Sequence, residues 1–409
     1  MKNQNLLARQ ANVGFSAIMG SYVSAGSVLF GFTAVFLQSR NLSNTQIGLT
    51  IAIGSAIAIF LPALISFLTG RTRMPLKYVV ALISLVTLSG ASLLLFVRAP
   101  VGVVMMIFIL ISASGASTGP FINALAMQFE NIGIHINYGI ARGLGSAGYA
   151  LIGFVTGHFV QMLGTDFIIP FYLCLSAIAV FCVFIFKRPV RPAESVPKTE
   201  PAVQLTQKAS VWSVFKTPSA VCLFCAIICV SLNQGVLDTF QINILKGLGG
   251  TDADYGSLIL VMAFSELPTM FLFKNLAKRF GYSRLLGAGF LFFAVKDIAL
   301  LLAPNVAIVI GVQALNALSL GLYIPASVYL INSLAGGRNA VHAQAIFGGV
   351  ASGLGRIVGN FAGGAIIDAY STHAMMVFAL VSILAGFVLL QFAVRLRKDR
   401  QQAVVPQAD

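Results

Sequence analysis

Charged side chains are scarce in this chain of 409 residues. Only 9% of the residues are Asp, Glu, Lys or Arg, against 58% that are hydrophobic. Soluble globular domains carry about 25% charged residues. The apolar runs are long enough for helices and too continuous for the alternating strands of a barrel. The composition therefore excludes an ordinary soluble protein and predicts an all-α integral membrane protein.

Several motifs of chemistry are also missing. The sequence has no His-Glu-x-x-His pair and no phosphate-binding loop. These absences count against an intramembrane enzyme and against a primary pump, which would need a nucleotide-binding domain. We expect no enzymatic activity and no cofactor. No cleavable signal-peptide pattern accompanies the first apolar run, so we expect this run to remain in the protein.

Cysteine and basic residues do not indicate a metal or nucleic-acid site. Cys222, Cys225 and Cys229 have a spacing that resembles a metal site, but no His and no polar loop lie nearby. We expect them to be small buried residues and predict no metal site. The net charge is +14, but the basic residues fall at the ends of apolar segments, as topology determinants do. We expect no nucleic-acid partner.

The apolar runs predict twelve membrane-spanning helices, each near the roughly 20 residues that a bilayer core requires. Their predicted limits are 12–38, 45–70, 76–97, 100–129, 138–163, 167–186, 217–245, 254–277, 282–302, 305–333, 341–368 and 373–396. A polar, proline-rich segment divides them into two sets of six. The predicted parts are an N-terminal half (1–186), a cytoplasmic linker (187–216), a C-terminal half (217–396) and a cytoplasmic tail (397–409).

The positions of Lys and Arg predict the orientation. Nearly all that lie outside the helices fall on one side of the membrane, and only Arg40, Arg98 and Lys246 fall on the other. The positive-inside rule then places both termini and the linker in the cytoplasm. Within the linker, 209–216 with the single Trp212 could be a short surface helix or a plain loop. We expect a multi-pass protein of the cytoplasmic (inner) membrane, in contact with membrane lipid.

The two halves share short patterns in corresponding helices. The most direct match is Gly143-Leu-Gly145 in the fifth helix with Gly353-Leu-Gly355 in the eleventh. Leu61-Pro62 likewise matches Leu267-Pro268 in the second and eighth helices. Two pseudo-symmetric halves with a site between them, near the midplane, are typical of secondary transporters.

A few ionisable residues fall well inside the predicted helices. They are Arg142, Asp238, Glu266, Lys296, Asp297 and Arg356. A charge at the bilayer centre costs at least about 2.5–3.5 kcal/mol, so each should face an aqueous cavity or a partner. Lys296 and Asp297 point about 100° apart on a helix, so we expect them to have different partners.

Asp238 and Glu266 are candidates for proton coupling. Asn233, Gln234, Asp238 and Gln241 form one polar stripe, which could line a cavity or form a hydrogen-bonded seam between helices. Glu266 precedes Leu267-Pro268, and a proline often marks a bend at a moving part. A buried carboxyl group can bind and release a proton near neutral pH. The alternative for Glu266 is a permanent ion pair with Lys296 or Arg356.

The fifth predicted helix carries the most specific pattern, Ala141-Arg142-x-x-Gly145-Ser146-x-Gly148-Tyr149. With it, nearly the whole chain resembles the major facilitator superfamily, and within it the lactose permease-like group. The resemblance implies that Arg142 holds substrate hydroxyls, that Tyr149 stacks on the substrate ring and that Ser146 lies beside the substrate. Glu266-Leu-Pro resembles the eighth-helix acid of the group, which contacts substrate and couples protons.

Two of the departures from that group concern the predicted site. Asn123 stands where an acid pairs with the fifth-helix Arg, and Asn316 stands where a His is usual in the tenth helix. Arg142 cannot lose its proton, so it needs another partner, and we expect Glu266 from the other half. Asn123, Gln241, Asn316 and Tyr22 complete the predicted substrate-binding residues.

These observations together predict a secondary active transporter that works by alternating access. We expect a small polar solute, namely a sugar, oligosaccharide or nucleoside, and symport with protons through Glu266, Asp238 or Asp297. An efflux antiporter for sugars or drugs is the alternative within transport. A membrane sensor that transports nothing is the alternative from another class. Nothing in the sequence requires an oligomer, and we expect a monomer.

Overall fold

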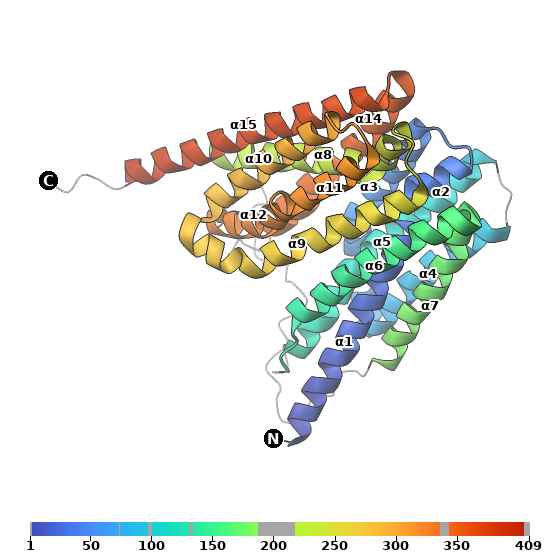
Figure 1. Ribbon diagram of the computed structural model, residues 1–409. Helices are drawn as coiled ribbons and strands as arrows, with labels where there is room; N and C mark the ends of the chain where they lie inside the picture. Colours follow the sequence, from blue (N-terminus) through green and yellow to red (C-terminus); the bar gives the residue numbers. More distant parts are fainter. Residues whose placement is uncertain are drawn as a thin grey trace.

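In the computed structural model the chain is a bundle of long helices (Figure 1). The structure describes residues 2–72, 74–96, 100–130, 134–186, 217–335 and 343–404. The predicted linker 187–216, with Trp212 and the surface helix considered for 209–216, lies outside these residues, as do 405–409 of the predicted tail. In the described part of the chain, all regular secondary structure is helical.

The N-terminal half contains helices α1 to α7. Their bounds are α1 Lys2–Leu29, α2 Thr33–Ser39, α3 Asn44–Thr72, α4 Leu76–Phe96, α5 Val101–Glu130, α6 Tyr138–Leu163 and α7 Ile168–Ile185. Together α1 and α2 make up the first predicted span, which is broken between Leu29 and Thr33.

The C-terminal half begins with α8. Its helices are α8 Pro218–Gly247, α9 Asp252–Phe280, α10 Tyr282–Leu301, α11 Val306–Val312, α12 Leu320–Ala335, α14 Ser352–Ala369 and α15 Thr372–Val404. A 3-10 segment, Gln313–Ala317, joins α11 to α12, and a π-helical segment, Ala345–Ala351, leads into α14. The last helix continues to Val404, into the predicted tail.

The predicted twelve spans in two halves are confirmed. Within the described residues, eleven helical stretches are long and apolar enough to cross a membrane, and α10 is the twelfth. α10 carries three charged residues, Arg284, Lys296 and Asp297. Arg284 is exposed near the start of the helix, whereas Lys296 and Asp297 are buried, so the two charges in the second half of α10 lie inside the protein.

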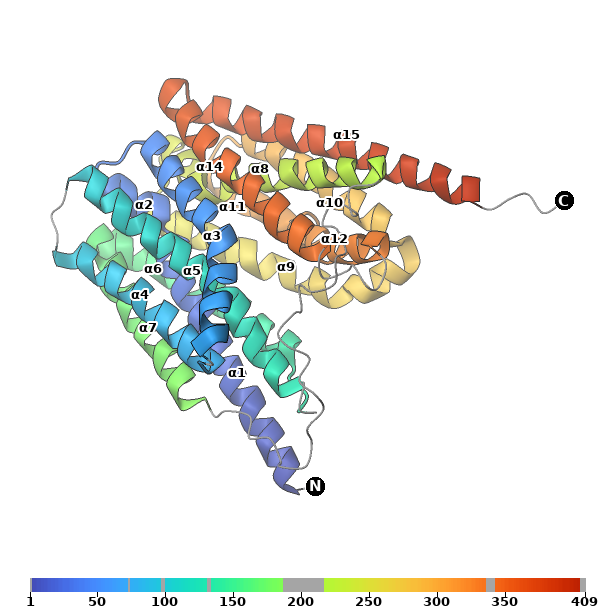
Figure 2. The same ribbon diagram turned by 180° about the vertical axis from the view of Figure 1, so that it is seen from behind.

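The two halves meet at one end and diverge toward the other (Figures 1 and 2). We call these the closed end and the open end. At the closed end, the end of α6 contacts the start of α9, and the start of α3 contacts the end of α14. The N terminus of α1 and the C-terminal end of α15 lie on separate arms at the open end (Figure 1).

Three groups of buried apolar residues explain this shape. One is shared by both halves at the closed end, where Phe32, Phe36 and Phe108 belong to the same cluster as Phe240 and Tyr255. The other two lie within single halves, one in each. Because apolar contact between the halves is concentrated at the closed end, the open end is free to separate.

Glycine allows the close contact. A Cβ atom on Gly157 would lie 2.5 Å from the carbonyl oxygen of Asp252 and 2.7 Å from Cα of Gly256. A Cβ atom on Gly48 would lie 2.1 Å from the carbonyl oxygen of Asn360. Small residues let helix backbones approach in membranes. Here they hold the two halves together at the closed end.

The contact predicts the effect of a side chain at Gly157. Gly157→Val should prevent α6 and α9 from closing, at a cost of about 1–3 kcal/mol typical of overpacking. The thermal midpoint of the detergent-purified protein should fall. Gly143→Val, on the same helix, is the matched control, because a Cβ atom there meets nothing within 4 Å. Equal midpoints for the two variants would contradict the contact.

Candidate functional site

A cavity of about 560 Å³ lies between the halves. Residues of α1, α3, α5 and α6 form one wall, and residues of α8, α9, α10, α12 and α14 form the other. Its volume falls within the range of about 300–1,000 Å³ found for small-molecule sites. A site between the two halves is the arrangement expected of a transporter fold.

The wall from the N-terminal half is built on α6. Arg142, Ser146 and Tyr149 are spaced by four and three residues, so they share one face of the helix, and all three line the cavity. Gly145 and Gly148 lie toward α1, where Cβ atoms would be 3.3 Å from Val23 and 2.1 Å from Ser24 Oγ. The glycine face therefore packs on α1 and presents the other face to the cavity.

Arg142 has a neutral partner in this conformation. Its Nη1 donates to Ser146 Oγ at 3.1 Å. The expected pair with Glu266 is not formed: among the described residues, no ion pair within 4.0 Å involves either side chain. The physical reason is the conformation, because α6 and α9 touch at the closed end and diverge toward the level of these two residues.

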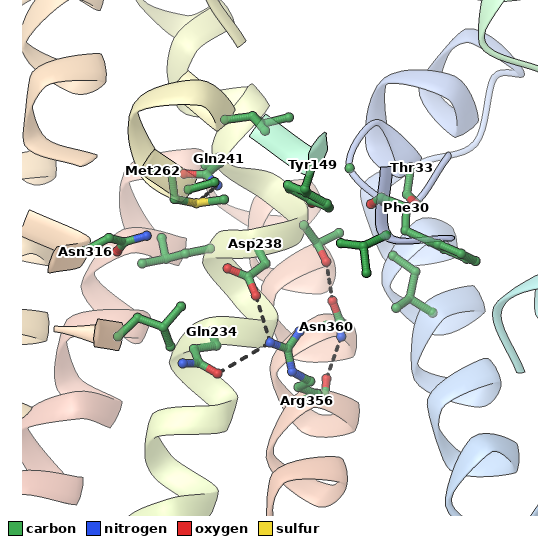
Figure 3. A pocket seen from close by; sticks show the side chains of 18 of the residues that line it. Phe30, Thr33, Tyr149, Gln234, Asp238, Gln241, Met262, Asn316, Arg356 and Asn360 are labelled. Atoms are coloured by element: carbon green, nitrogen blue, oxygen red, sulfur yellow. Dashed lines mark hydrogen bonds and ion pairs between the residues drawn. The ribbon is translucent and has the colours of Figure 1, made fainter. Parts of the chain in front are cut away.

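The opposite wall carries an ion pair (Figure 3). Arg356 Nη2 lies 2.9 Å from Asp238 Oδ2 and 3.4 Å from Gln234 Oε1. Asn360 Nδ2 donates to the carbonyl oxygen of Arg356 at 2.7 Å, and Thr239 Oγ1 donates to Asn360 Oδ1 at 2.6 Å. This network joins α8 to α14 and gives both charges a partner inside the membrane.

A second chain of polar contacts runs from α10 to α9. Lys296 Nζ donates to Asn316 Oδ1 at 2.8 Å, and Asn316 Nδ2 makes a long contact of 3.5 Å with Glu266 Oε1. All three residues line the cavity. Lys296 is only 7% exposed, so the amide oxygen of Asn316 is important for keeping its ammonium group buried. Glu266 reaches the cavity as a carboxylate without an ion pair among the described residues.

Asp297 lies behind this wall. It is 2% exposed, it is not among the residues that line the cavity, and it accepts a hydrogen bond from Asn233 Nδ2. Asn233 Nδ2 also donates to the carbonyl oxygen of Ala379 at 3.0 Å. Lys296 and Asp297 therefore have different partners, and Asp297 is placed to fix Asn233 rather than to touch a solute.

The remaining predicted binding residues have different positions. Gln241 and Tyr22 line the cavity, and Tyr22 Oη donates to the carbonyl oxygen of Gly115 at 2.6 Å. The structure does not place Asn123 in the cavity lining: its Oδ1 accepts from Tyr138 Oη at 3.1 Å. Asn123 is about two helical turns beyond the lining residue Ala116 toward the open end, too far along α5 to join the site.

Broken helices at the cavity are features that sequence reasoning missed. Phe30, Gly31 and Thr33 line the cavity at the break between α1 and α2. A Cβ atom on Gly31 would lie 2.2 Å from the carbonyl oxygen of Ser27, so the glycine itself was the available signal. Tyr255 Oη from the other half donates to the carbonyl oxygen of Gly31 at 3.0 Å. Irregular backbone at membrane depth is tolerated where it is buried in protein or lines a cavity.

The tenth span is irregular at the same depth. It was predicted as one helix, but the 3-10 segment Gln313–Ala317 interrupts it and carries Asn316. The π-helical segment Ala345–Ala351 similarly precedes Arg356 by about one turn. Departures from regular α-helix often occur at functional sites. In this chain they accompany two of the polar residues that line the cavity.

One motif resembles a nucleophile but cannot act as one. Gly115-Ala-Ser117-Thr-Gly119 matches the Gly-x-Ser-x-Gly pattern of hydrolases. It lies inside α5, whereas that pattern works at a sharp strand-to-helix turn. Ser117 is 1% exposed and donates to the carbonyl oxygen of Ala113 at 2.7 Å. The hydroxyl group is therefore buried and bonded to the backbone of its own helix.

The buried contact between Lys296 and Asn316 generates a stability prediction. Asn316→Leu removes the acceptor of a buried ammonium group, which should cost about 2–3 kcal/mol, because a charged donor is left without its hydrogen bond. The denaturation midpoint in detergent should fall. The double variant Asn316→Leu/Lys296→Met removes the charge as well and should recover most of the loss. The contact would be unimportant if the single variant were as stable as the parent.

Comparison with known proteins agrees with this geometry. The sequence model described as the MFS_1 like family matches residues 21–380. The chain is 26% identical over 384 residues to a maltose permease of Geobacillus stearothermophilus, covering 91% of this chain and 92% of the permease. It is 26% identical over 212 residues to a putative sugar efflux transporter of Deinococcus radiodurans, covering 52% and 53% of the two chains.

The fold is also shared with solved structures. The crystal structure of the nucleoside transporter NupG superposes with a TM-score of 0.78, over 93% of this chain and 98% of that one. The two sequences are 12% identical, so this likeness concerns the fold alone.

Proposed function

This chain belongs to the MFS_1 like family, within the major facilitator superfamily of membrane transporters, and from this premise we propose the class of solute and the mechanism. As a member of that superfamily it is a multi-pass membrane transporter and not an enzyme. The proposed solute is a small polar molecule rich in hydroxyl groups, namely a sugar, an oligosaccharide or a nucleoside.

The combination of amides and aromatic rings around the cavity carries the proposal, and Tyr255 and Phe293 add rings on the C-terminal side. The wall from the C-terminal half presents the side-chain amides of Asn233, Gln234, Gln241, Asn316 and Asn360. Amides donate and accept hydrogen bonds, as hydroxyl groups do. The wall from the N-terminal half presents the rings of Tyr22, Phe30 and Tyr149. A solute with a flat apolar face and several hydroxyl groups fits between them.

Arg142 supplies the donor on the ring-bearing wall. Its guanidinium group is exposed in the cavity and is held by one neutral hydroxyl, that of Ser146. A guanidinium group offers several donors in a fixed plane, which suits neighbouring hydroxyl groups of a sugar. The relative named as a maltose permease supports this class through its name.

Alternating access follows from the two ends of the bundle. The present conformation is closed at one end by the glycine contacts and open at the other. We place both termini and the open end in the cytoplasm, from the excess of Lys and Arg on that side, and the protein in the cytoplasmic (inner) membrane. In this scheme the conformation is the inward-facing one, and rocking of the halves exposes the cavity to the outside.

Proton symport is the proposed coupling, with Glu266 as the carrier. Its carboxyl group faces the cavity, and among the residues that the structure describes its side-chain partner is Asn316, in a long contact of 3.5 Å. Asp238 is engaged with Arg356, and Asp297 is behind the wall. Glu266 is therefore the acid most free to exchange a proton with the cavity and, when the halves close, to approach Arg142.

Efflux of a sugar or drug in exchange for protons is the second candidate. The relative named as a putative sugar efflux transporter favours it, as does the absence of the usual coupling His at Asn316. Uptake and efflux are separated by the direction of solute movement in vesicles with an imposed pH gradient.

Arg142 provides the first test. A solute is first identified by a thermal-shift screen over sugars, nucleosides and aromatic acids. Arg142→Lys should then reduce counterflow in proteoliposomes at least about tenfold, because an ammonium group cannot reproduce a planar pair of hydrogen bonds. Arg40→Lys is the matched control, since Arg40 pairs with Asp166 at 2.9 Å away from the cavity. Full counterflow by Arg142→Lys would remove Arg142 from the binding role.

Glu266 tests the coupling. Glu266→Gln keeps the shape of the side chain and removes its titration. Accumulation driven by a pH gradient should be lost, while solute exchange at equilibrium continues. Glu130→Gln is the control, because that carboxylate accepts from the backbone N–H of Ile136 at 2.7 Å near the open end. If Glu266→Gln accumulated solute as the parent does, the proton carrier would have to be another acid.

A further inference from the structure

One carboxylate bonds across the closed end between the two halves. Asp368, near the end of α14, accepts from the backbone N–H groups of Asn44 at 3.2 Å and Thr45 at 2.7 Å. It also accepts from Asn44 Nδ2 at 2.8 Å and from Thr45 Oγ1 at 2.7 Å. All four donors belong to the first two residues of α3, in the other half. Each hydrogen bond therefore crosses the interface that must open in a transport cycle.

The first two N–H groups of α3 need an acceptor from outside their own half. Ser43 and Gln46 satisfy each other: Gln46 N donates to Ser43 Oγ at 3.3 Å, and Ser43 N donates to Gln46 Oε1 at 3.0 Å. This reciprocal cap uses the third N–H group of the helix. The N–H groups of Asn44 and Thr45 remain without an acceptor from their own half, and Asp368 provides it.

Glycine brings the carboxylate to this position. Gly364 lies one turn before Asp368 on α14, and a Cβ atom there would be 2.1 Å from the carbonyl oxygen of Asn44. The two backbones are therefore in contact just beside the start of α3. A negative charge at a helix N-terminus is favoured by the helix dipole, and hydrogen bonds to a carboxylate are stronger than those between neutral groups.

The other polar contacts that cross between the halves at this end join neutral groups. Gln38 Nε2 donates to Asn243 Oδ1 at 2.7 Å, and Asn243 Nδ2 donates to Asn44 Oδ1 at 2.9 Å. These amide contacts also cross between the halves. The ion pair of Arg40 with Asp166, at 2.9 Å, is contained within the N-terminal half. Among the described residues, Asp368 is thus the charged group that bonds across the closed interface.

We propose that Asp368 is a latch that holds the closed end shut by capping α3 from the opposite half. Opening this end breaks four hydrogen bonds together and leaves two N–H groups at the start of α3 for water to satisfy. The latch thereby biases the equilibrium toward the conformation seen here and slows opening of the closed end. It rests on the alternating access proposed above, and it depends on neither the solute nor the proton.

Distance measurement in the purified full chain tests the latch. Spin labels at Leu163 and Leu248, at the closed-end termini of α6 and α8, report separation of the halves in a background without the five native cysteines. Asp368→Asn keeps the size of the side chain and removes its charge and one acceptor oxygen. The population with long distances should rise roughly three- to tenfold relative to the parent.

Asp166→Asn is the matched control, because it removes an exposed carboxylate whose ion pair lies within one half. It should leave the distance distribution unchanged. An unchanged distribution for Asp368→Asn, or an equal shift for Asp166→Asn, would overturn the latch. No solute or gradient is used, so this outcome is independent of the proposed solute and coupling.

A second variant covers the case in which Asp368→Asn does not yield folded protein. Thr45→Val removes one of the four donors and leaves the carboxylate in place. It should shift the distances in the same direction by a smaller factor. A distribution identical to that of the parent would overturn the latch on its own.

Discussion

Two helix backbones can touch only where neither carries a side chain in the way, and this constraint shapes the whole molecule. Gly157 meets Gly256, and Gly48 meets the backbone of Asn360, both at the closed end. The shared aromatic core lies around the same contacts. Away from them each half has its own core, so the halves diverge and leave a cavity. The position of the glycines therefore decides where the solute site can be.

The membrane then decides how that cavity is lined. Every ionisable group within the spans needs a partner or water, and the structure distributes them unequally. The N-terminal half contributes Arg142, while Asp238, Glu266, Lys296 and Arg356 belong to the C-terminal half. Most of these charges are held within their own half, either in an ion pair or by amides. In the described part of the chain, Arg142 bonds a neutral hydroxyl group and Glu266 makes a long amide contact. These two groups line the cavity from opposite halves.

Departures from the lactose permease-like pattern have structural counterparts. Asn123 does not take the place of the missing acid. Arg142 donates instead to Ser146, one turn further along its own helix, α6. Asn316 stands in the tenth span where the group has a His, and its side-chain oxygen accepts a hydrogen bond from Lys296. Both substitutions exchange a titratable group for a neutral hydrogen-bonding group. They reduce the number of acids that could exchange a proton with the cavity and leave Glu266 as the principal candidate.

Composition and the lengths of the apolar runs determined the membrane class and the twelve spans, because the bilayer requires apolar helices of fixed length. The polar, proline-rich segment between the sixth and seventh spans indicated the division into halves. The same rule identified the charged residues, since each is an exception to it. The contact partners of these residues could not be predicted in the same way. Asn123 lies outside the cavity because of packing within its own half. That Arg142 has no ion pair with Glu266, and that Asp368 caps α3, depend on how the halves are placed relative to each other. That placement is set by contacts between residues far apart in the chain, which no local pattern records.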